Sequence, residues 1–82
     1  MINVLFFAQI RELVGTDQLS LPAESELTAE RLRQQLLSRG EKWQLALADA
    51  NVLVAVNQTL SGWDTPLKSG DEVAFFPPVT GG

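Results

Sequence analysis

The sequence contains neither cysteine nor histidine. Their absence excludes disulfides, zinc sites built from the usual ligands and cysteine nucleophiles. It also removes the side chain best suited to proton transfer at neutral pH. Because the chain offers no nucleophile–base pair, a stand-alone enzyme is the least favoured class, and no metal site is expected.

Basic residues are also scarce, with six lysines and arginines against ten acidic residues and a formal net charge of −4. Nucleic-acid binding requires a basic stripe, so no nucleic-acid partner is expected. An acidic surface serves either solubility or a basic protein partner. The apolar run at residues 4–8 is too short to cross a bilayer and lacks the layout of a signal peptide. We therefore expect a cytoplasmic protein with no membrane partner.

The 82 residues, 45% hydrophobic and 20% charged, have the balance of one small globular domain without an internal active-site cavity. Short apolar runs rich in Val and Phe predict strands. In the first of them, Ile2, Val4 and Phe6 share one face, while Leu5 and Phe7 share the other. The predicted strands are residues 2–8, 18–21 and 52–56, a short segment near Leu60, and residues 72–76.

One long helix is predicted over residues 28–39. Thr28 suits its N-cap, and Gly40 suits the left-handed position that follows a last turn. Apolar residues recur at spacings of three and four, as expected for a helix that covers a core. These residues are Ala29, Leu32 and Leu36.

The order of the elements predicts an α+β fold. Residues 41–48 could form a short second helix, and residues 11–17 are expected to form a loop around Gly15. A single long helix must then cover one face of a mixed sheet. The first and last strands are the most apolar, so they are expected side by side at its centre. We predict a β-grasp (ubiquitin-like) domain over residues 1–76.

The remaining residues, 77–82, are predicted to form an extended tail. Pro77 and Pro78 end the last strand and favour a stiff segment. Six residues reach about 20 Å at full extension, whereas a domain of this size has a radius of gyration of about 12 Å. Gly81 and Gly82 lack side chains and fit a narrow channel. The tail is therefore predicted to enter a cleft in another protein.

The reactive group predicted for the tail is the α-carboxylate of Gly82. Its ordinary pKa lies far below neutrality, so the group is ionised and is a poor electrophile. Activation as a mixed anhydride with a nucleotide would let it react with a sulfur donor or with an amine. The chain has no phosphate loop. ATP is therefore expected to be bound by a partner, and this chain to be a passive carrier with no permanently bound cofactor.

Residues 70–82, Gly-Asp-Glu-Val-Ala-Phe-Phe-Pro-Pro-Val-Thr-Gly-Gly, closely resemble the C-terminus of the MoaD-type sulfur carriers, the small subunits of molybdopterin synthases. Residues 4–8, 11–13 and 55–57 are also similar to that family. The resemblance implies that an activating enzyme related to those of ubiquitin, an adenylyltransferase, uses ATP to adenylate Gly82. A sulfurtransferase then converts the glycyl adenylate to a thiocarboxylate.

The resemblance further implies docking on a large synthase subunit, in a heterotetramer of two small and two large subunits. There the carrier would give sulfur to cyclic pyranopterin monophosphate, building the dithiolene of molybdopterin for the molybdenum cofactor. Gly82 would be the covalent carrier, with Gly81 giving clearance behind it. The other tail residues would aim the tail or contact the channel: Pro77, Pro78, Val79 and Thr80.

An apolar docking face is expected where the single helix leaves the sheet uncovered. The candidates for it are Phe7 and either Phe75 or Phe76, because a Phe-Phe pair in a strand puts one ring on each face. Core packing is the alternative for each. Arg11 is a further candidate contact, with a solvated loop arginine as the alternative. Asp71 is expected to form a turn rather than to take part in catalysis.

Two other functions stay open. One keeps the fold and changes the acceptor, as in a thiamine-pathway sulfur carrier or a ubiquitin-like protein modifier. The Phe-Phe-Pro-Pro-Val-Thr stem argues against both, through the resemblance alone. The other is an interaction module with an inert tail, in which deletion of Gly82 would leave the function intact.

Overall fold

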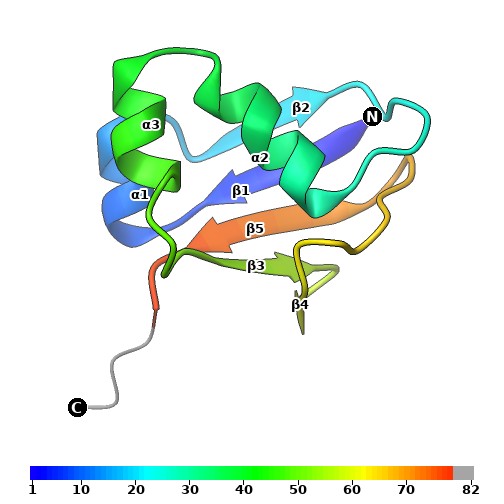
Figure 1. The fold of residues 1–82 in the computed structure, drawn as a ribbon. Helices are drawn as coiled ribbons and strands as arrows, with labels where there is room; N and C mark the ends of the chain where they lie inside the picture. The colour runs from blue at the N-terminus through cyan, green and yellow to red at the C-terminus, as the bar shows by residue number, and fades with distance from the viewer. Residues whose placement is uncertain (79–82) are drawn as a thin grey trace.

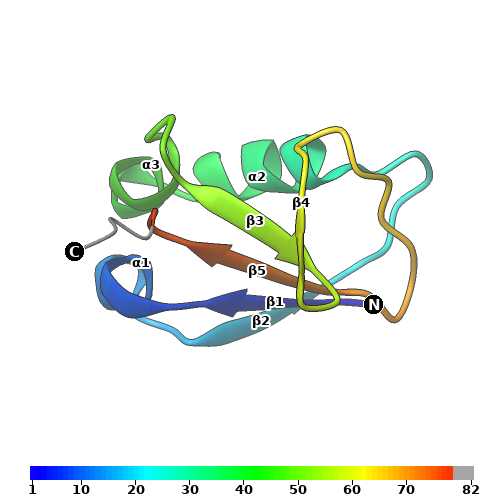
Figure 2. The same ribbon diagram turned by 90° about the horizontal axis from the view of Figure 1, so that it is seen from below.

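Residues 1–78, the part of the chain that the computed structural model describes, form a five-stranded mixed sheet and three helices (Figures 1 and 2). The strands are β1 (Ile2–Phe6), β2 (Gln18–Leu21), β3 (Leu53–Val56), β4 (Thr59–Ser61) and β5 (Glu72–Phe76). The helices are α1 (Ala8–Val14), α2 (Ala29–Leu37) and α3 (Glu41–Leu47).

The sheet has the strand order β2-β1-β5-β3-β4. β1 and β5 are parallel neighbours at its centre, with Phe6 opposite Phe75, which confirms the prediction from their apolar runs. The other pairs, β1–β2, β3–β5 and β3–β4, are antiparallel. α2 and α3 lie over one face of this sheet (Figure 1). The predicted β-grasp fold is therefore confirmed.

α2 forms much as its sequence predicts. Thr28 is the N-cap, and its Oγ1 accepts a hydrogen bond from the Arg31 N–H at 3.2 Å. This bond satisfies one of the first-turn N–H groups that have no partner within the helix. The predicted stripe faces the core, and each of its residues is fully buried: Ala29, Leu32 and Leu36.

The predicted role of Gly40 is wrong. α2 ends at Leu37, and Ser38 closes it in the right-handed conformation. Gly40 is instead the N-cap of α3, with φ +148° and ψ −177°. This conformation is open almost only to glycine, so Gly40 turns the chain from one helix into the next.

The predicted loop over residues 11–17 is also wrong, because most of it belongs to α1. Ile10 and Val14, one turn apart, are buried against the core. Gly15 ends the helix in the left-handed conformation (φ +81°), and its N–H donates to the Arg11 carbonyl at 2.9 Å. A stripe of two apolar residues is too short to give a clear helical period in the sequence.

Four aromatic rings cross the core in series. The ring centroids of Trp43 and Phe6 are 5.6 Å apart, those of Phe6 and Phe75 are 6.2 Å apart, and those of Phe75 and Trp63 are 5.9 Å apart. The series ties α3 to the two central strands just before the tail begins. Within residues 1–78, no helix combines the length and the apolar character needed to cross a bilayer.

Candidate functional site

The predicted tail begins at the end of a central strand. Because β1 and β5 are parallel, their carboxyl ends lie at the same end of the sheet. α1 begins there, directly after β1, and both ribbon views place this end opposite the N-terminus (Figures 1 and 2). β5 ends at Phe76 and is followed at once by Pro77 and Pro78. The remaining predicted tail residues lie outside the described residues: Val79, Thr80, Gly81 and Gly82.

The sheet face opposite α2 and α3 carries an apolar row. Alternation along each strand turns these side chains away from the core. The row crosses β1, β5, β3 and β4 in turn, through Leu5, Ala74, Ala55 and Leu60. A second cross-strand pair on the same face joins Leu53 to Phe76, next to the tail. The apolar residues of this surface, called the open face below, are Leu5, Leu53, Ala55, Leu60, Ala74 and Phe76.

The three candidate phenylalanines separate between core and surface. Phe75 is fully buried between the rings of Phe6 and Trp63, so its assignment to the docking face is wrong. Phe76 points the other way and lies half-buried on the open face. Phe7 has an extended backbone that continues the alternation of β1, and its side chain is 46% exposed. Phe7 and Phe76 therefore border the point where the tail departs.

Leu60 is a surface residue that the sequence analysis did not single out. It is 66% exposed on β4. The signal was present in the sequence, because a two-residue turn at Asn57-Gln58 fixes the pairing of the flanking strands. That pairing sets Leu60 opposite Ala55, on the open face.

Arg11 lies on α1 rather than in a loop, and its side chain is exposed. Within residues 1–78, no ion pair engages it. Its helix follows directly after Phe7, at the end of the sheet where the tail begins. Arg11 is therefore available to a partner that approaches this end.

Asp71 is the buried charged residue of the domain, with only 6% of its surface exposed. Its Oδ1 accepts from the Asn57 side-chain N–H₂ at 3.0 Å, and its Oδ2 accepts from the Lys68 N–H at 2.9 Å. The bond from Asn57, helped by the Lys68 N–H and the Lys68 charge, holds the pKa of Asp71 below its ordinary value against the opposing effect of burial. Asp71 precedes β5, at the opposite end of that strand from the tail, and it holds a turn as expected.

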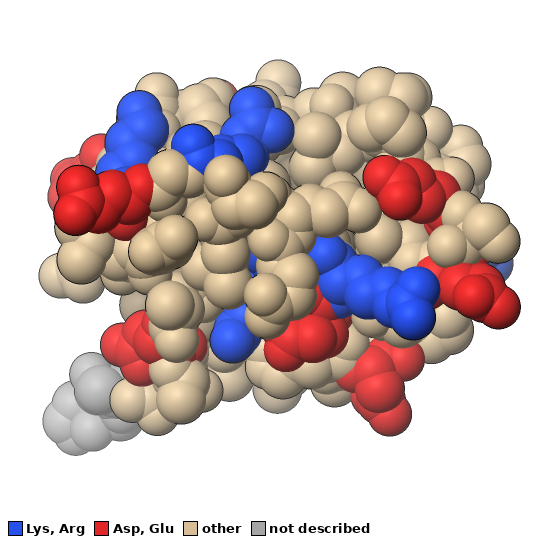
Figure 3. Space-filling model, turned by 45° about the horizontal axis from the view of Figure 1, so that its top comes forward, with Lys and Arg blue, Asp and Glu red and all other residues tan. Residues whose placement is uncertain are grey.

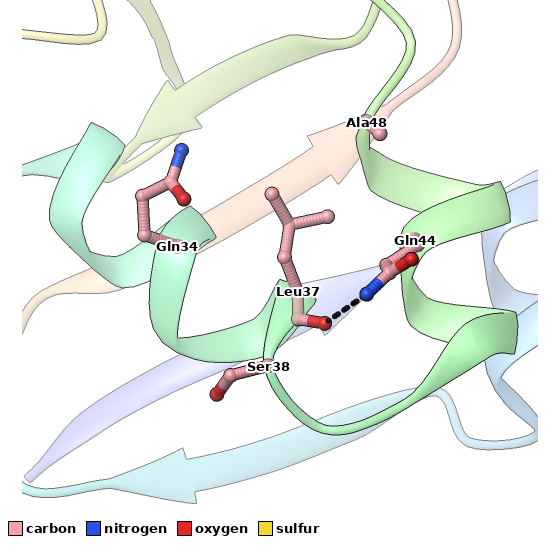
Figure 4. A pocket seen from close by; sticks show the side chains of 5 residues that line it. All are labelled: Gln34, Leu37, Ser38, Gln44 and Ala48. Atoms are coloured by element: carbon pink, nitrogen blue, oxygen red, sulfur yellow. Dashed lines mark hydrogen bonds between the residues drawn. The ribbon is translucent and has the colours of Figure 1, made fainter.

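A shallow cleft of about 400 Å³ lies between α2 and α3 (Figure 4). A hydrogen bond from the Gln44 side-chain N–H₂ to the Leu37 carbonyl, at 3.5 Å, joins the two helices across it. The lining residues are Gln34, Leu37, Ser38, Gln44 and Ala48, none of which titrates near neutrality. The helical face around it carries charges of both signs interspersed (Figure 3). The cleft supplies no chemistry of its own and lies on the side away from the open face.

Comparisons with known proteins match the whole chain. The model of the ThiS family matches residues 4–82. The molybdopterin synthase sulfur carrier subunits of Escherichia coli (strain K12) and Haemophilus influenzae are 60% and 55% identical to it, each over 82 residues and 100% of both chains. Among solved structures, the complex of subunits 1 and 2 of the molybdopterin-converting factor from Helicobacter pylori contains a chain that matches with a TM-score of 0.70 and 29% identity. That match covers 99% of this chain and 97% of the other.

Proposed function

The chain belongs to the ThiS family, and from the names of its most similar relatives we propose that it is the sulfur-carrier subunit of a molybdopterin synthase. Its relatives at 60% and 55% identity bear that name and align over their full length. The structural observation that carries the proposal is the exit of the tail. The central strand β5 runs directly into Pro77-Pro78 at the border of the apolar open face. A partner seated on that face would receive the tail.

The proposed chemistry takes place at Gly82. A carboxylate oxygen of Gly82 attacks the α-phosphorus of ATP on an activating adenylyltransferase, and pyrophosphate leaves. A hydrosulfide equivalent (HS⁻) supplied through a sulfurtransferase then attacks the acyl carbon and displaces AMP. The new carbon–sulfur bond replaces the bond to AMP, and loss of the sulfur-bound proton leaves a thiocarboxylate. On the large subunit the thiocarboxylate sulfur bonds to a carbon of cyclic pyranopterin monophosphate, and an oxygen substituent leaves that carbon. Water then hydrolyses the resulting thioester, which leaves the sulfur on the pterin and restores the carboxylate of Gly82. The chain binds no nucleotide itself in this scheme.

The partner inferred for the final step is the large synthase subunit, as in the Helicobacter pylori complex of subunits 1 and 2. The chain alone is not an enzyme in this proposal, because it contributes the donor group and no acid–base pair. The chain has a net charge of −4. The basic residues that bind an anionic substrate are therefore expected on the partner. A heterotetramer of two small and two large subunits is the assembly that we propose.

The alternative acceptors are less well supported. The family model alone does not separate a molybdopterin carrier from a thiamine-pathway carrier or a protein modifier. The 60% identity to the Escherichia coli molybdopterin subunit favours the first. The archaeal modifier of Haloferax volcanii matches at 20% identity, which shows a common fold only.

Intact-mass measurement tests the proposal. We expect incubation with ATP, the activating enzyme and a sulfur source to raise the mass by the replacement of one oxygen with one sulfur. The product should convert cyclic pyranopterin monophosphate when the large subunit is added. A variant that lacks Gly82 should do neither. Sulfur delivery to the thiamine-pathway acceptor, with none to the pterin, would reject the proposed function in favour of its closest alternative.

A further inference from the structure

β4 is weakly held by its own pairing. It has three residues, lies at the edge of the sheet and pairs only with β3. Figure 2 shows it running steeply across the direction of the other strands. A hairpin of this size has marginal stability in isolation. Yet β4 carries Leu60, the most exposed large apolar side chain of the open face.

The turn before β4 is fastened to the start of β5 through one residue, Asn57, which makes one backbone bond and two side-chain bonds. The Asn57 N–H donates to the Glu72 carbonyl at 2.8 Å, and the Asn57 Oδ1 accepts from the Glu72 N–H at 3.0 Å. The third bond of Asn57 goes from its side-chain N–H₂ to Asp71, whose other oxygen is held by Lys68. These contacts join two segments that lie about fifteen residues apart in the sequence.

The buried carboxylate makes this arrangement specific. A carboxylate only accepts hydrogen bonds, so it fixes the N–H₂ of Asn57 toward Asp71 and leaves the amide oxygen for Glu72. Asn57 and Gln58 both have positive φ, +52° and +68°. Glycine would adopt these angles at less cost. It has no side-chain amide, however, and so could not bond to both Asp71 and Glu72 as Asn57 does. Asn57 therefore provides a connection beyond what the turn requires.

We propose that Asn57 and Asp71 act as a clamp that positions Leu60 for docking on the large synthase subunit. This inference rests on the proposed function, and it makes both residues positioning residues rather than partner contacts. The clamp sets the direction in which the β3–β4 hairpin leaves the sheet. It thereby fixes the position of the β4 edge of the open face. Phe76 lies at the other side of that face, next to the tail.

The test measures binding of the large subunit by isothermal titration calorimetry. Asn57→Gly removes both side-chain bonds of the clamp while keeping the backbone bond to Glu72 and allowing the same turn angles. Gln58→Gly is the matched control in the same turn. We expect Asn57→Gly to weaken binding about tenfold and Gln58→Gly to leave it within about twofold. In the free protein, hydrogen exchange should show lower protection of the β4 amides in Asn57→Gly alone.

A double-mutant cycle with Leu60→Ala separates positioning from general stability. If the clamp acts through Leu60, the double variant Asn57→Gly/Leu60→Ala should bind no more weakly than Leu60→Ala alone. Asp71→Asn disrupts the clamp at its other residue and should also weaken binding. Combined with Leu60→Ala, it should bind no more weakly than Leu60→Ala alone. Losses that multiply, or full binding by Asn57→Gly, would overturn the clamp. Failure of the unsubstituted chain to bind the large subunit would instead overturn the proposed function, and this inference with it.

Discussion

A single buried carboxylate, that of Asp71, links the stability of this domain to pH. Its pKa is lowered in the folded state, chiefly by the hydrogen bond from Asn57. A carboxylate with a lowered folded pKa contributes stability above its unfolded pKa, and the contribution is lost as pH falls through the folded value. At neutral pH, Asp71→Asn should reduce the free energy of unfolding by about 1–3 kcal/mol, because the two donors face different oxygens and asparagine would turn its N–H₂ group toward one of them.

The pH dependence distinguishes this effect from a simple packing defect. Below about pH 4, the difference between the original protein and Asp71→Asn should shrink, because the carboxylate of the original protein becomes protonated. Urea denaturation at neutral pH and at several acidic pH values measures this difference, since the other carboxyl groups are common to both proteins. A difference that stays constant with pH would contradict the assignment.

Ala8 is a second residue whose conformation predicts a measurable effect. It joins β1 to α1 with φ +54°, in the left-handed region. A non-glycine residue there costs about 1 kcal/mol or more. Ala8→Gly should therefore raise the free energy of unfolding by about 0.5–1 kcal/mol. Its exposed neighbour Gln9, inside the helix, gives the control, because Gln9→Gly should lower it by about 1 kcal/mol. Thermal unfolding that gave both variants the same sign would refute the strain at Ala8.

At the scale of elements, the open face predicts that one exposed leucine matters and another does not. Leu60 on β4 and Leu45 on α3 are 66% and 69% exposed. Leu60→Asp places a charge in the apolar face and should weaken binding of the large subunit by about a hundredfold or more. Leu45→Asp should change binding by less than about twofold. Calorimetry on both variants, with thermal unfolding as a check on the fold, makes the comparison. Equal losses from the two changes would show that docking does not use this face.

The sequence allowed the sheet to be predicted because its strands have a strong local signal. The alternation in β1 and the branched residues of β3 set both the elements and their inward faces. α1 was missed because the apolar run of β1 continues into Phe7 and Ala8, and the following helix buries only Ile10 and Val14. Short elements depend on tertiary contacts, which a local pattern does not contain.

The candidate site was predictable in part for a related reason. The paired Phe75-Phe76 had to point to opposite faces, because side chains alternate along a strand. Which ring enters the core depends on the pairing of β5 with β1, where Phe75 lies opposite Phe6. Leu60 depends on the next pairing outward, between β3 and β4. The sequence thus identified the aromatic candidates, while the register decided which of them reach the surface.

At the scale of the whole molecule, the domain separates packing from chemistry. Among residues 1–78, the buried hydrophobic residues lie between Ile2 and Phe75, so the core closes before the tail begins. The helices cover one face, and the other remains open to a partner beside the point where Pro77 departs. The proposed reactive group belongs to a residue that follows this core in the sequence, so changes there should be separable from stability.

Changes to the last residue test this separation. Deletion of Gly82, or addition of one alanine after it, should leave the melting temperature within about 1 °C, because the hydrophobic core of residues 1–78 is complete at Phe75. Both variants should fail to gain sulfur when their intact mass is measured. The deletion moves the terminal carboxylate back by one residue, and the added alanine moves it forward by one residue. One alanine added before Met1 is the control, and it should leave sulfur loading unchanged. Sulfur loading that persisted in either tail variant would mean that the carboxylate of Gly82 is not the carrier. A large drop in melting temperature would mean that the end of the tail packs on the folded domain.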